Sequence, residues 1–286
     1  MRLQKKMGPL LVAPAMLLIA FLLIWPLFYT VYCSFLKLDY LFYGGFVGWD
    51  NYRSILSDSS VYSSFGVTFL VTILSTGISM LLGLILALWI DKRSGVLALS
   101  IELVGLLPWV ISMMVGAMLW RWLLNGDTSL FNHLLRLLGQ EPVQLFNRKA
   151  ESIATLIAVM AWRTVGYSMV MILAGLKGVS ESLIEAAHVD GANRWQVLHK
   201  IKLPLIKTPL LISAVVLTMS NFNNNTVPMV LTSGGPSNAT NVITLYLYKL
   251  SFEYYKFGNA SALSTLLFAV NAVMIVMYIR MVKYDV

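Results

Sequence analysis

The chain has 286 residues, of which 58% are hydrophobic and only 12% are charged, and its formal net charge is +8. A soluble domain carries about 25% charged residues, so the composition excludes an ordinary soluble protein and predicts a polytopic membrane protein with a single transmembrane domain over residues 1–286. Basic residues in membrane proteins gather in loops, and the chain has no basic block or zinc-ligand spacing, so we predict no nucleic-acid partner and no metal site.

Six apolar stretches predict six transmembrane helices, because a helix needs about 20 apolar residues to cross a bilayer. They are residues 8–35, 64–90, 97–120, 152–176, 208–231 and 259–279. The first follows MRLQKK, which is typical of a signal peptide. It is too long for a signal core and lacks a small-residue cleavage site, so we predict a retained span. The predicted fold class is therefore all-α.

The distribution of Lys and Arg predicts the orientation of these spans. With the N-terminus inside, the cytoplasmic segments contain 12 basic residues, whereas the longer outer segments contain 8. Cytoplasmic loops carry the excess of Lys and Arg, so both termini are predicted to be cytoplasmic. This orientation places residues 177–207, called the 177–207 loop below, on the cytoplasmic side.

The outer segment 127–139, DTSLFNHLLRLLG, has leucines at helical spacing. Asp127 or Thr128 is suited to cap such a helix at its N-terminus. We predict an amphipathic helix that lies at the outer membrane interface.

The 177–207 loop contains EAAHVDGANRWQVLHKIKLP, a compact polar segment between two apolar stretches. Ser182 stands three residues before Glu185, which fits a capping box at the start of a short helix. Gly191 supplies the conformational freedom that a tight helix exit needs. Asn193 and Gln196 are placed to cap a second short helix. The pattern predicts a helix, a glycine turn and a second helix.

The second helix of the loop would carry Val197, Leu198 and Ile201 on one face and would be closed by Leu203-Pro204. A DNA-binding helix-turn-helix is disfavoured, because both helices run into membrane segments and leave no soluble core. A plain solvated loop is the other alternative. A plain solvated loop has no need for helix caps, a defined turn and an apolar face in the same segment. We therefore favour a surface that docks into a partner.

The same residues resemble the signature of ABC-importer permease subunits. The matching residues are Glu185-Ala186-Ala187, Asp190-Gly191-Ala192, Ile201, Leu203-Pro204 and Pro209. In the carbohydrate branch of the family, Phe usually stands where this chain has Leu198. Residues 221–240 are similar to the stretch ending LTxGGPxxxT in the first permease of maltose- and glycerol-phosphate-type importers, and residues 161–187 follow the same pattern. The resemblance extends from about residue 8 to residue 283.

The resemblance implies a type I importer transmembrane domain in a bacterial or archaeal cytoplasmic membrane. It implies a second homologous permease, two copies of a cytoplasmic ABC ATPase and an external solute-binding protein. The 177–207 loop would transmit closure of the ATPase, with Glu185 as its anchor and Gly191 shaping its turn. The residues implied in this coupling are Glu185, Ala186, Ala187, Asp190, Gly191, Ala192, Leu198, Ile201 and Pro204. The chain has no GxxxxGK[ST] motif, so ATP and Mg would be bound by the partner ATPases, and this subunit would be non-catalytic.

Polar residues in the fifth predicted span are candidates for contact with a solute, because polar groups inside a membrane are expensive and tend to be functional. Amides donate and accept hydrogen bonds together, which suits neutral hydroxyls. Asn221 and Asn224 are three residues apart and would share a helix face. In the resembling sugar permeases the matching asparagines line the sugar site. Hydrogen bonding between helices is the alternative, and it applies most to Asn223 and Asn225.

The fourth predicted span contributes Trp162, Arg163 and Tyr167 as further candidates. An aromatic ring can stack on the apolar face of a sugar. Arg163 is the only basic residue within a predicted span, and it would favour a carboxylate, sulfonate or phosphate on the solute. A structural ion pair with a partner permease, or a position near the outer interface, is the alternative.

Three other functions compete with a carbohydrate permease. A secondary transporter would have ion-coupling charges in several spans, whereas this chain has Glu102 and Arg163 and little else. An intramembrane enzyme would need a nucleophile with a base, or paired acids, and no such set is visible. A permease for an organic phosphate or an anionic sugar derivative stays open because of Arg163.

Overall fold

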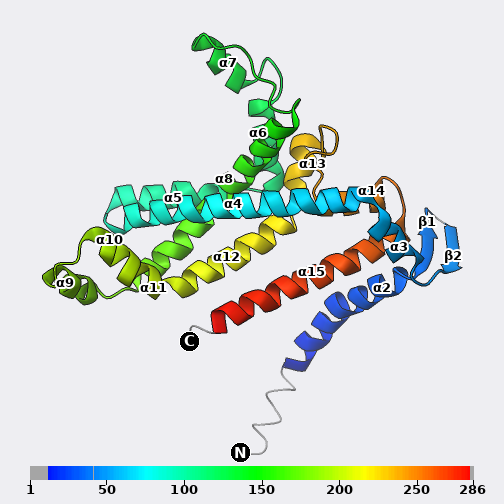
Figure 1. Cartoon of the computed structure of the whole chain (residues 1–286), viewed down its shortest axis with the longest axis horizontal. Helices are drawn as coiled ribbons and strands as arrows, with labels where there is room; N and C mark the ends of the chain where they lie inside the picture. Colours follow the sequence, from blue (N-terminus) through cyan, green and yellow to red (C-terminus); the bar gives the residue numbers. More distant parts are fainter. Residues whose placement is uncertain (1–11, 41, 284–286) are drawn as a thin grey trace, which may run out of the picture. The chain divides into compact units, whose positions relative to one another are not determined.

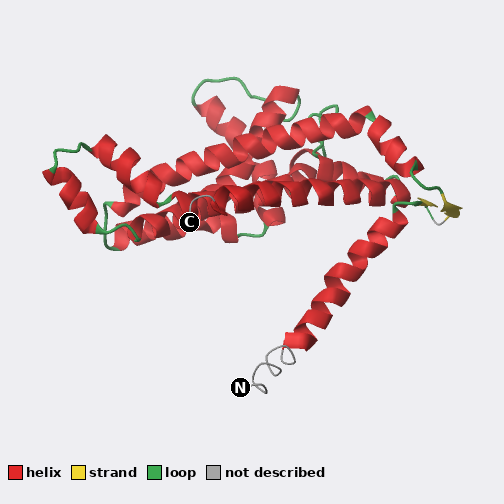
Figure 2. Ribbon diagram, turned by 60° about the horizontal axis from the view of Figure 1, so that its bottom comes forward, coloured by secondary structure: helices red, strands yellow, loops and turns green. Residues whose placement is uncertain are grey.

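The computed structural model describes residues 12–40 and 42–283, and helices account for most of this part of the chain (Figure 2). The chain forms two compact units. The first unit combines the residues up to Val61 with Tyr246–Ala272, and the second combines Tyr62–Leu245 with the residues from Val273 onward. The start of the first predicted span, residues 8–11, lies outside the described residues.

The first unit combines helices with a small two-stranded hairpin at its outer end (Figure 1). Its elements are η1 (Ala20–Ile24, a π turn), α2 (Trp25–Cys33), β1 (Leu36–Asp39), β2 (Phe42–Phe46), α3 (Asp50–Ser57) and most of α14 (Ile243–Phe252) and α15 (Phe257–Lys283). The two strands pair antiparallel. The side-chain amide of Asn51 donates to the carbonyl oxygens of Ser34 and Leu36, both at 2.8 Å, and so fixes α3 against the chain that enters the hairpin.

The second unit surrounds one long central helix, α8 (Lys149–Lys177). The other elements with most of their residues in this unit are α4 (Ser59–Asp91), α5 (Val96–Val110), α6 (Met113–Leu124), α7 (Leu130–Leu137), α9 (Glu181–Val189), α10 (Arg194–Val197), η2 (Leu198–Lys202, a π turn), α11 (Leu203–Leu205), α12 (Lys207–Phe222) and α13 (Thr226–Thr232). α5, α6, α12 and α13 all pack against α8. Two clusters of buried apolar side chains form along α8, one around Leu156 and Met160 and the other around Ile172 and Leu173.

Glycine allows the neighbouring helices to approach α8 closely. A Cβ atom on Gly166 would lie 1.9 Å from the carbonyl oxygen of Gly105 in α5. A Cβ atom on Gly83 in α4 would lie 2.5 Å from Oγ of Ser168. Small residues at helix contacts are typical of membrane proteins, because dispersion contacts between backbones replace the hydrophobic driving force that water supplies.

Four continuous helices in the described residues are long and apolar enough to cross a membrane. They are Val12–Cys33, Ser59–Asp91, Lys149–Lys177 and Phe257–Met281, and they correspond to the first, second, fourth and sixth predicted spans. Two bent pairs raise the number to six if each pair counts as one span: Val96–Val110 with Met113–Leu124, bent by 97°, and Arg194–Leu205 with Lys207–Phe222, bent by 67°.

The third and fifth predicted spans are each interrupted in the structure. α5 ends at Val110, shortly after Pro108, whose ring nitrogen cannot donate a helical hydrogen bond. In the fifth predicted span, α12 ends at Phe222 and α13 begins only at Thr226. The asparagines between them compete for backbone groups and end the helix.

The predicted helix in segment 127–139 is present as α7, but its predicted caps are wrong. Oγ of Ser129 accepts from the backbone N–H of Asn132 at 3.3 Å and caps the helix. The buried side chain of Asn132 then bonds the carbonyl oxygens of Gly126 and Val143 and the N–H of Val143. One amide thus ties both ends of this loop together, and Leu130, Leu134 and Leu137 of α7 are exposed.

Candidate functional site

The 177–207 loop forms the predicted helix, turn and helix at one end of the second unit (Figure 1). Gly191 has a φ of +80°, a conformation that residues with a side chain rarely adopt. It allows the chain to leave α9 and enter α10 within a short turn. The predicted role of Gly191 in the turn is confirmed.

One of the two predicted helix caps is present. Oδ1 of Asn193 accepts from the N–H of Gln196 at 2.9 Å, and the Gln196 side chain accepts from the N–H of Asn193 at 2.8 Å, which confirms this cap. The predicted capping box of Ser182 and Glu185 is wrong, because α9 begins one residue before Ser182, with Ser180 as its N-cap. The hydroxyls of Ser180 and Ser182 bond each other at 2.7 Å instead.

The absence of that capping box leaves the Glu185 carboxylate available. Glu185 is exposed and makes no hydrogen bond or ion pair within the part of the chain that the structure describes. The same loop carries exposed apolar side chains, with Val189 at 88%, Trp195 at 69% and Leu183 at 50% exposure. Val197 faces inward and is only 4% exposed. An exposed apolar surface with one free carboxylate has the character of a docking site.

The other predicted coupling residues lie at the same end of the second unit. Ala186, Asp190, Gly191 and Pro204 are exposed, and Ala187, Ala192, Leu198 and Ile201 are half-buried. Leu203-Pro204 does not close the second helix, contrary to the prediction. The chain stays helical through η2 and α11, and the break comes at Ile206. The π turn fits a proline that brings no N–H to the next helical turn.

An ion pair fixes the loop to the end of α4. Nζ of Lys202 lies 2.5 Å from Oδ2 of Asp91, and the two side chains are only 13% and 15% exposed. Partial burial strengthens such a pair relative to one in water. Movement of α10 and η2 is therefore mechanically connected to α4.

The asparagine side chains of the fifth predicted span form hydrogen bonds within the chain. Nδ2 of Asn221 donates to Oγ1 of Thr76 at 3.0 Å, and Oδ1 of Asn224 accepts from the N–H of Val227 at 3.0 Å. Both asparagines are buried, whereas Asn223 is exposed and Asn225 is half-buried. The expectation that Asn221 and Asn224 share one helix face is wrong, because α12 ends between them. Asn223 and Asn225 are thus more accessible than Asn221 and Asn224.

The residues of the fourth predicted span divide into two groups on α8. The Trp162 ring packs edge-on against Trp120 of α6, with centroids 5.4 Å apart. Arg163 and Tyr167 instead contact Trp109 of α5. The guanidinium carbon of Arg163 lies 5.2 Å from the Trp109 ring centroid, and the Tyr167 ring is 4.6 Å from it. Nε of Arg163 is buried without a hydrogen-bond partner.

This cluster of Trp109, Arg163 and Tyr167 combines flat aromatic surfaces with a cation. No carboxylate pairs with Arg163 in residues 12–40 and 42–283. Sequence reasoning missed Trp109, although its position next to Pro108, where α5 is about to end, marked it as a residue at a helix break. Such a cluster can stack on a ring and attract an anion.

A buried polar seam on α4 was also missed. Oγ of Ser79 bonds Oγ1 of Thr164 at 2.7 Å, and Oγ1 of Thr68 accepts from the N–H of Ile243 at 2.8 Å. With the contact of Thr76 to Asn221, these bonds connect α4 to α8, α12 and α14. Small hydroxyl residues recurring about every four positions in an apolar helix were the available signal.

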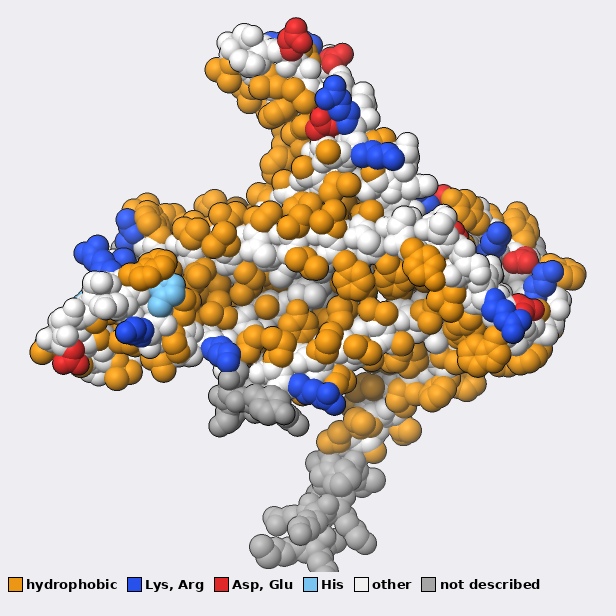
Figure 3. All heavy atoms as spheres, in the orientation of Figure 1, with side chains coloured by type: hydrophobic (Ala, Val, Ile, Leu, Met, Phe, Trp, Pro, Cys, Tyr) orange, Lys and Arg blue, Asp and Glu red, His pale blue; other side chains and the backbone are white. Residues whose placement is uncertain are grey.

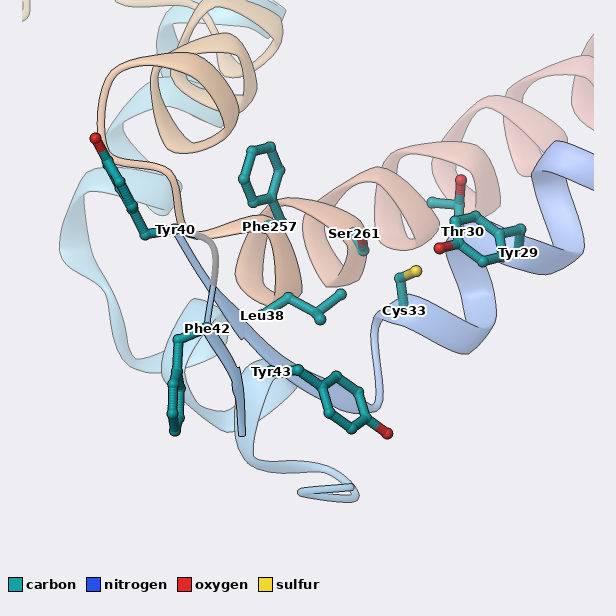
Figure 4. Close-up of a pocket in the computed structure, with 9 residues that line it drawn as sticks. All are labelled: Tyr29, Thr30, Cys33, Leu38, Tyr40, Phe42, Tyr43, Phe257 and Ser261. Atoms are coloured by element: carbon teal, nitrogen blue, oxygen red, sulfur yellow. The ribbon is translucent and has the colours of Figure 1, made fainter. Parts of the chain in front are cut away.

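The first unit contains a separate aromatic hollow of about 350 Å³ between α2, the hairpin and α15 (Figure 4). Its lining includes Tyr29, Tyr40, Phe42, Tyr43 and Phe257. None of the predicted solute-binding residues lines it.

A polar pair stands just before α4, outside the spans. The hydroxyl of Tyr246 donates to the carboxylate of Asp58, which also accepts from the N–H of Ser60 at 2.8 Å. Burial acts to raise the pKa of Asp58, but these hydrogen bonds and the charge of Lys256 outweigh it and lower that pKa. Burial and the Asp58 carboxylate raise the pKa of Tyr246. Asp58 is therefore ionised and Tyr246 neutral at pH 7.

Comparison with known proteins defines the class. The model of the family described as "Binding-protein-dependent transport system inner membrane component" matches residues 79–283. The chain belongs to this family, which confirms both the predicted resemblance and the predicted membrane location.

Individual relatives agree over nearly the whole chain. It is 28% identical to the sulfoquinovosyl glycerol transport system permease protein of Agrobacterium fabrum, over 98% of this chain and 91% of that one. It is 30% identical to the trehalose/maltose transport system permease protein of Thermococcus litoralis, over 98% and 95%. A solved structure of a bacterial ABC transporter involved in import of the acidic polysaccharide alginate is 22% identical with a TM-score of 0.84, and 99% of each chain is covered. This likeness establishes the fold of an ABC-importer permease.

Proposed function

We propose that the chain forms half of the translocation path of an ATP-driven importer for a sugar, oligosaccharide or sugar derivative. The relatives that support this proposal are permeases for a sulfoquinovosyl glycerol and for trehalose and maltose. In this proposal the chain is a single type I transmembrane domain with six spans, in which α5 and α6 form the third span and α12 and α13 form the fifth, and both termini are cytoplasmic.

The partners in this proposal are a second homologous permease, two copies of a cytoplasmic ABC ATPase and an extracytoplasmic solute-binding protein. ATP and Mg are bound by the ATPases, and this subunit is non-catalytic. The 177–207 loop docks into an ATPase and transmits its closure. The observation that carries the coupling role is the exposed, unpaired Glu185 among exposed apolar side chains.

The ion pair of Lys202 with Asp91 gives this loop a route to the membrane helices. When the ATPase draws the loop inward, α10 and η2 pull on the end of α4. The polar seam of α4 connects that helix to α8 and α12, which carry the candidate solute contacts. In this proposal Tyr167, Arg163 and Asn225 contact the solute, while Asn221, Asn224 and Trp162 hold the surrounding helices in place.

The test compares Glu185→Lys with Glu181→Lys in the assembled transporter, measuring uptake and ATPase stimulation by the loaded binding protein. Both carboxylates are exposed and lie on α9, so the change of charge is matched. We expect Glu185→Lys to abolish coupling with membrane levels unchanged and Glu181→Lys to retain most uptake. Normal uptake with Glu185→Lys would refute the coupling role.

A second candidate solute is an anionic sugar derivative, favoured by the cluster of Trp109, Arg163 and Tyr167. The unpartnered Nε of Arg163 has hydrogen-bonding capacity that a carboxylate or sulfonate oxygen would use. Arg163→Gln should then weaken uptake of an acidic sugar about tenfold or more while sparing a neutral one. Equal loss for both sugars would show that Arg163 is structural.

A further inference from the structure

A groove of about 440 Å³ lies between the end of α4 and the 177–207 loop. Basic side chains gather at this end of the second unit, as Figure 3 shows in blue. The residues that line the groove are Leu88, Lys92, Ile184, His188, Arg194, Trp195, Val197, Leu198 and Lys202. Apolar side chains thus form most of its wall, and cations stand among them.

The charges of this groove are unbalanced. Lys202 is neutralised by Asp91, but neither Lys92 nor Arg194 makes an ion pair with any residue that the structure describes. No acidic residue lines the groove. It therefore presents two uncompensated cations beside an apolar surface.

The position of the groove corresponds to the membrane surface. The apolar run of α4 ends at Asp91, with Trp89 in its last turn and Arg93 two residues beyond its end. The guanidinium carbon of Arg93 lies 3.5 Å from the Trp89 ring centroid, and its Nη1 donates to the Trp89 carbonyl at 2.6 Å. Tryptophan and arginine in this arrangement are typical of the boundary between acyl chains and headgroups. Leu88 is one turn deeper than Lys92, so the groove reaches from the headgroup region toward the acyl chains.

We propose that this groove binds an anionic phospholipid, with Lys92 and Arg194 on its phosphate and with Leu88, Ile184 and Leu198 against the start of an acyl chain. An amphiphile matches both the two free cations and the apolar wall. A free phosphate ion would use the cations and leave the apolar wall in water. Basic pockets between membrane helices bind phospholipid headgroups in the same way.

A phospholipid bound in the groove would hold the 177–207 loop in place. Ile184 belongs to α9 and Arg194 to α10, so one lipid molecule contacts both helices as well as α4. It therefore stabilises the arrangement in which the loop is held against α4. The assembled transporter should respond to anionic lipid through this contact.

The first experiment measures lipid binding to the full chain in mild detergent by native mass spectrometry. The probes are dioctanoyl phosphatidylglycerol, dioctanoyl phosphatidylcholine and inorganic phosphate. We expect phosphatidylglycerol to bind and phosphatidylcholine to bind at least tenfold more weakly. Equal binding of the two lipids, or displacement of phosphatidylglycerol by an equal concentration of phosphate, would overturn the assignment.

Variants locate the site. The double variant Lys92→Gln/Arg194→Gln should weaken phosphatidylglycerol binding by roughly 10- to 30-fold, from two lost surface cations. The charge-preserving exchange Lys92→Arg/Arg194→Lys should bind it normally. Lys200→Gln is the matched control, because Lys200 is an exposed cation of the same loop that lies outside this groove. Equal weakening by Lys200→Gln would show a diffuse charge effect and overturn the site.

A second measurement separates lipid from protein as the occupant. In the assembled transporter in nanodiscs, backbone amide hydrogen exchange is measured for residues 194–202, the segment that contains Trp195. The measurement is made with and without phosphatidylglycerol. Protection that depends on the lipid supports the proposal. Full protection by the ATPase subunit in lipid without net charge would assign the groove to a protein interface instead.

Discussion

Gly166 and Gly105 show how strongly single residues determine the packing of the second unit. Their backbones meet where α5 crosses α8, in the same stretch of helix that carries Arg163 and Tyr167. The position of the aromatic and cationic side chains therefore depends on the absence of a methyl group.

Gly166→Ala should destabilise the chain by about 1–3 kcal/mol, because the new methyl group meets backbone that cannot rotate away. Gly77→Ala is the control, since a Cβ atom on Gly77 meets nothing within 4 Å. Alanine there should be neutral or slightly stabilising by helix propensity. Thermal unfolding in detergent measures both, and equal stability of the two variants would contradict the close approach.

Two threonines of α4 offer a matched pair of side chains. Oγ1 of Thr76 accepts a hydrogen bond from Nδ2 of Asn221, whereas the hydroxyl of Thr72 is buried without a partner. Thr76→Val should cost about 0.6–1.7 kcal/mol. Thr72→Val should be neutral or stabilising, because it removes an unsatisfied polar group. A double-mutant cycle of Thr76→Val with Asn221→Ala checks the pair, and a coupling energy of zero would rule out the bond.

Among the elements, the 177–207 loop shows most clearly what sequence could and could not predict. Gly191 and the pair of Asn193 and Gln196 carry local signals, because turns and caps depend on neighbouring residues. The predicted start of α9 differs from the observed one by two residues, since Ser180 and Ser182 are equally good caps by type. The ion pair with Asp91 could not be predicted, because 111 positions separate the partners.

The broken helices were missed for a related physical reason. Hydropathy reports how apolar a segment is, not whether it is straight, so residues 97–120 and 208–231 were both read as single spans. Pro108 and the asparagines after Phe222 mark the breaks, but proline and asparagine are tolerated inside membrane helices when neighbouring groups satisfy the freed backbone. Only the packing around α8 decides whether such a segment stays one continuous helix or breaks into two.

Asp91→Asn should release the 177–207 loop from α4. It leaves the charge of Lys202 partly buried without its partner, at a local cost of roughly 1–3 kcal/mol. Asp50→Asn is the control, because the pair of Asp50 with Arg53 is exposed and contributes little. Faster hydrogen exchange in residues 194–205 of the first variant alone is expected, and an unchanged rate would show that the ion pair does not hold the loop.

For the whole molecule, the two compact units have separate stabilising interactions, so their responses to conditions should differ. The first unit contains the pair of Asp58 with Tyr246, and the second contains the helices around α8. An acid titration can therefore act on the first unit through a known group.

Asp58 should make stability depend on pH in a defined direction. Its native pKa is lowered relative to an unfolded value of about 3.9, so its contribution is present above about pH 4 and is lost as the pH falls through the native pKa. At pH 7, Asp58→Asn should lower the free energy of unfolding by less than about 1 kcal/mol, which a lower melting temperature would show. Well below pH 4 the substitution should have no effect on stability. Glu253→Gln, an exposed change in the same unit, is the control, and a pH-independent effect of Asp58→Asn would exclude the ionised carboxylate as its cause.

The exposed side chains of the 177–207 loop also have a consequence for how the protein is made. Val189 and Leu183 stay in contact with water until a partner covers them. A chain synthesised in excess of its partners therefore exposes hydrophobic surface of the type that chaperones and membrane proteases recognise. Surplus copies should be degraded faster than assembled ones, so that the abundance of this subunit follows that of the partner that covers the loop.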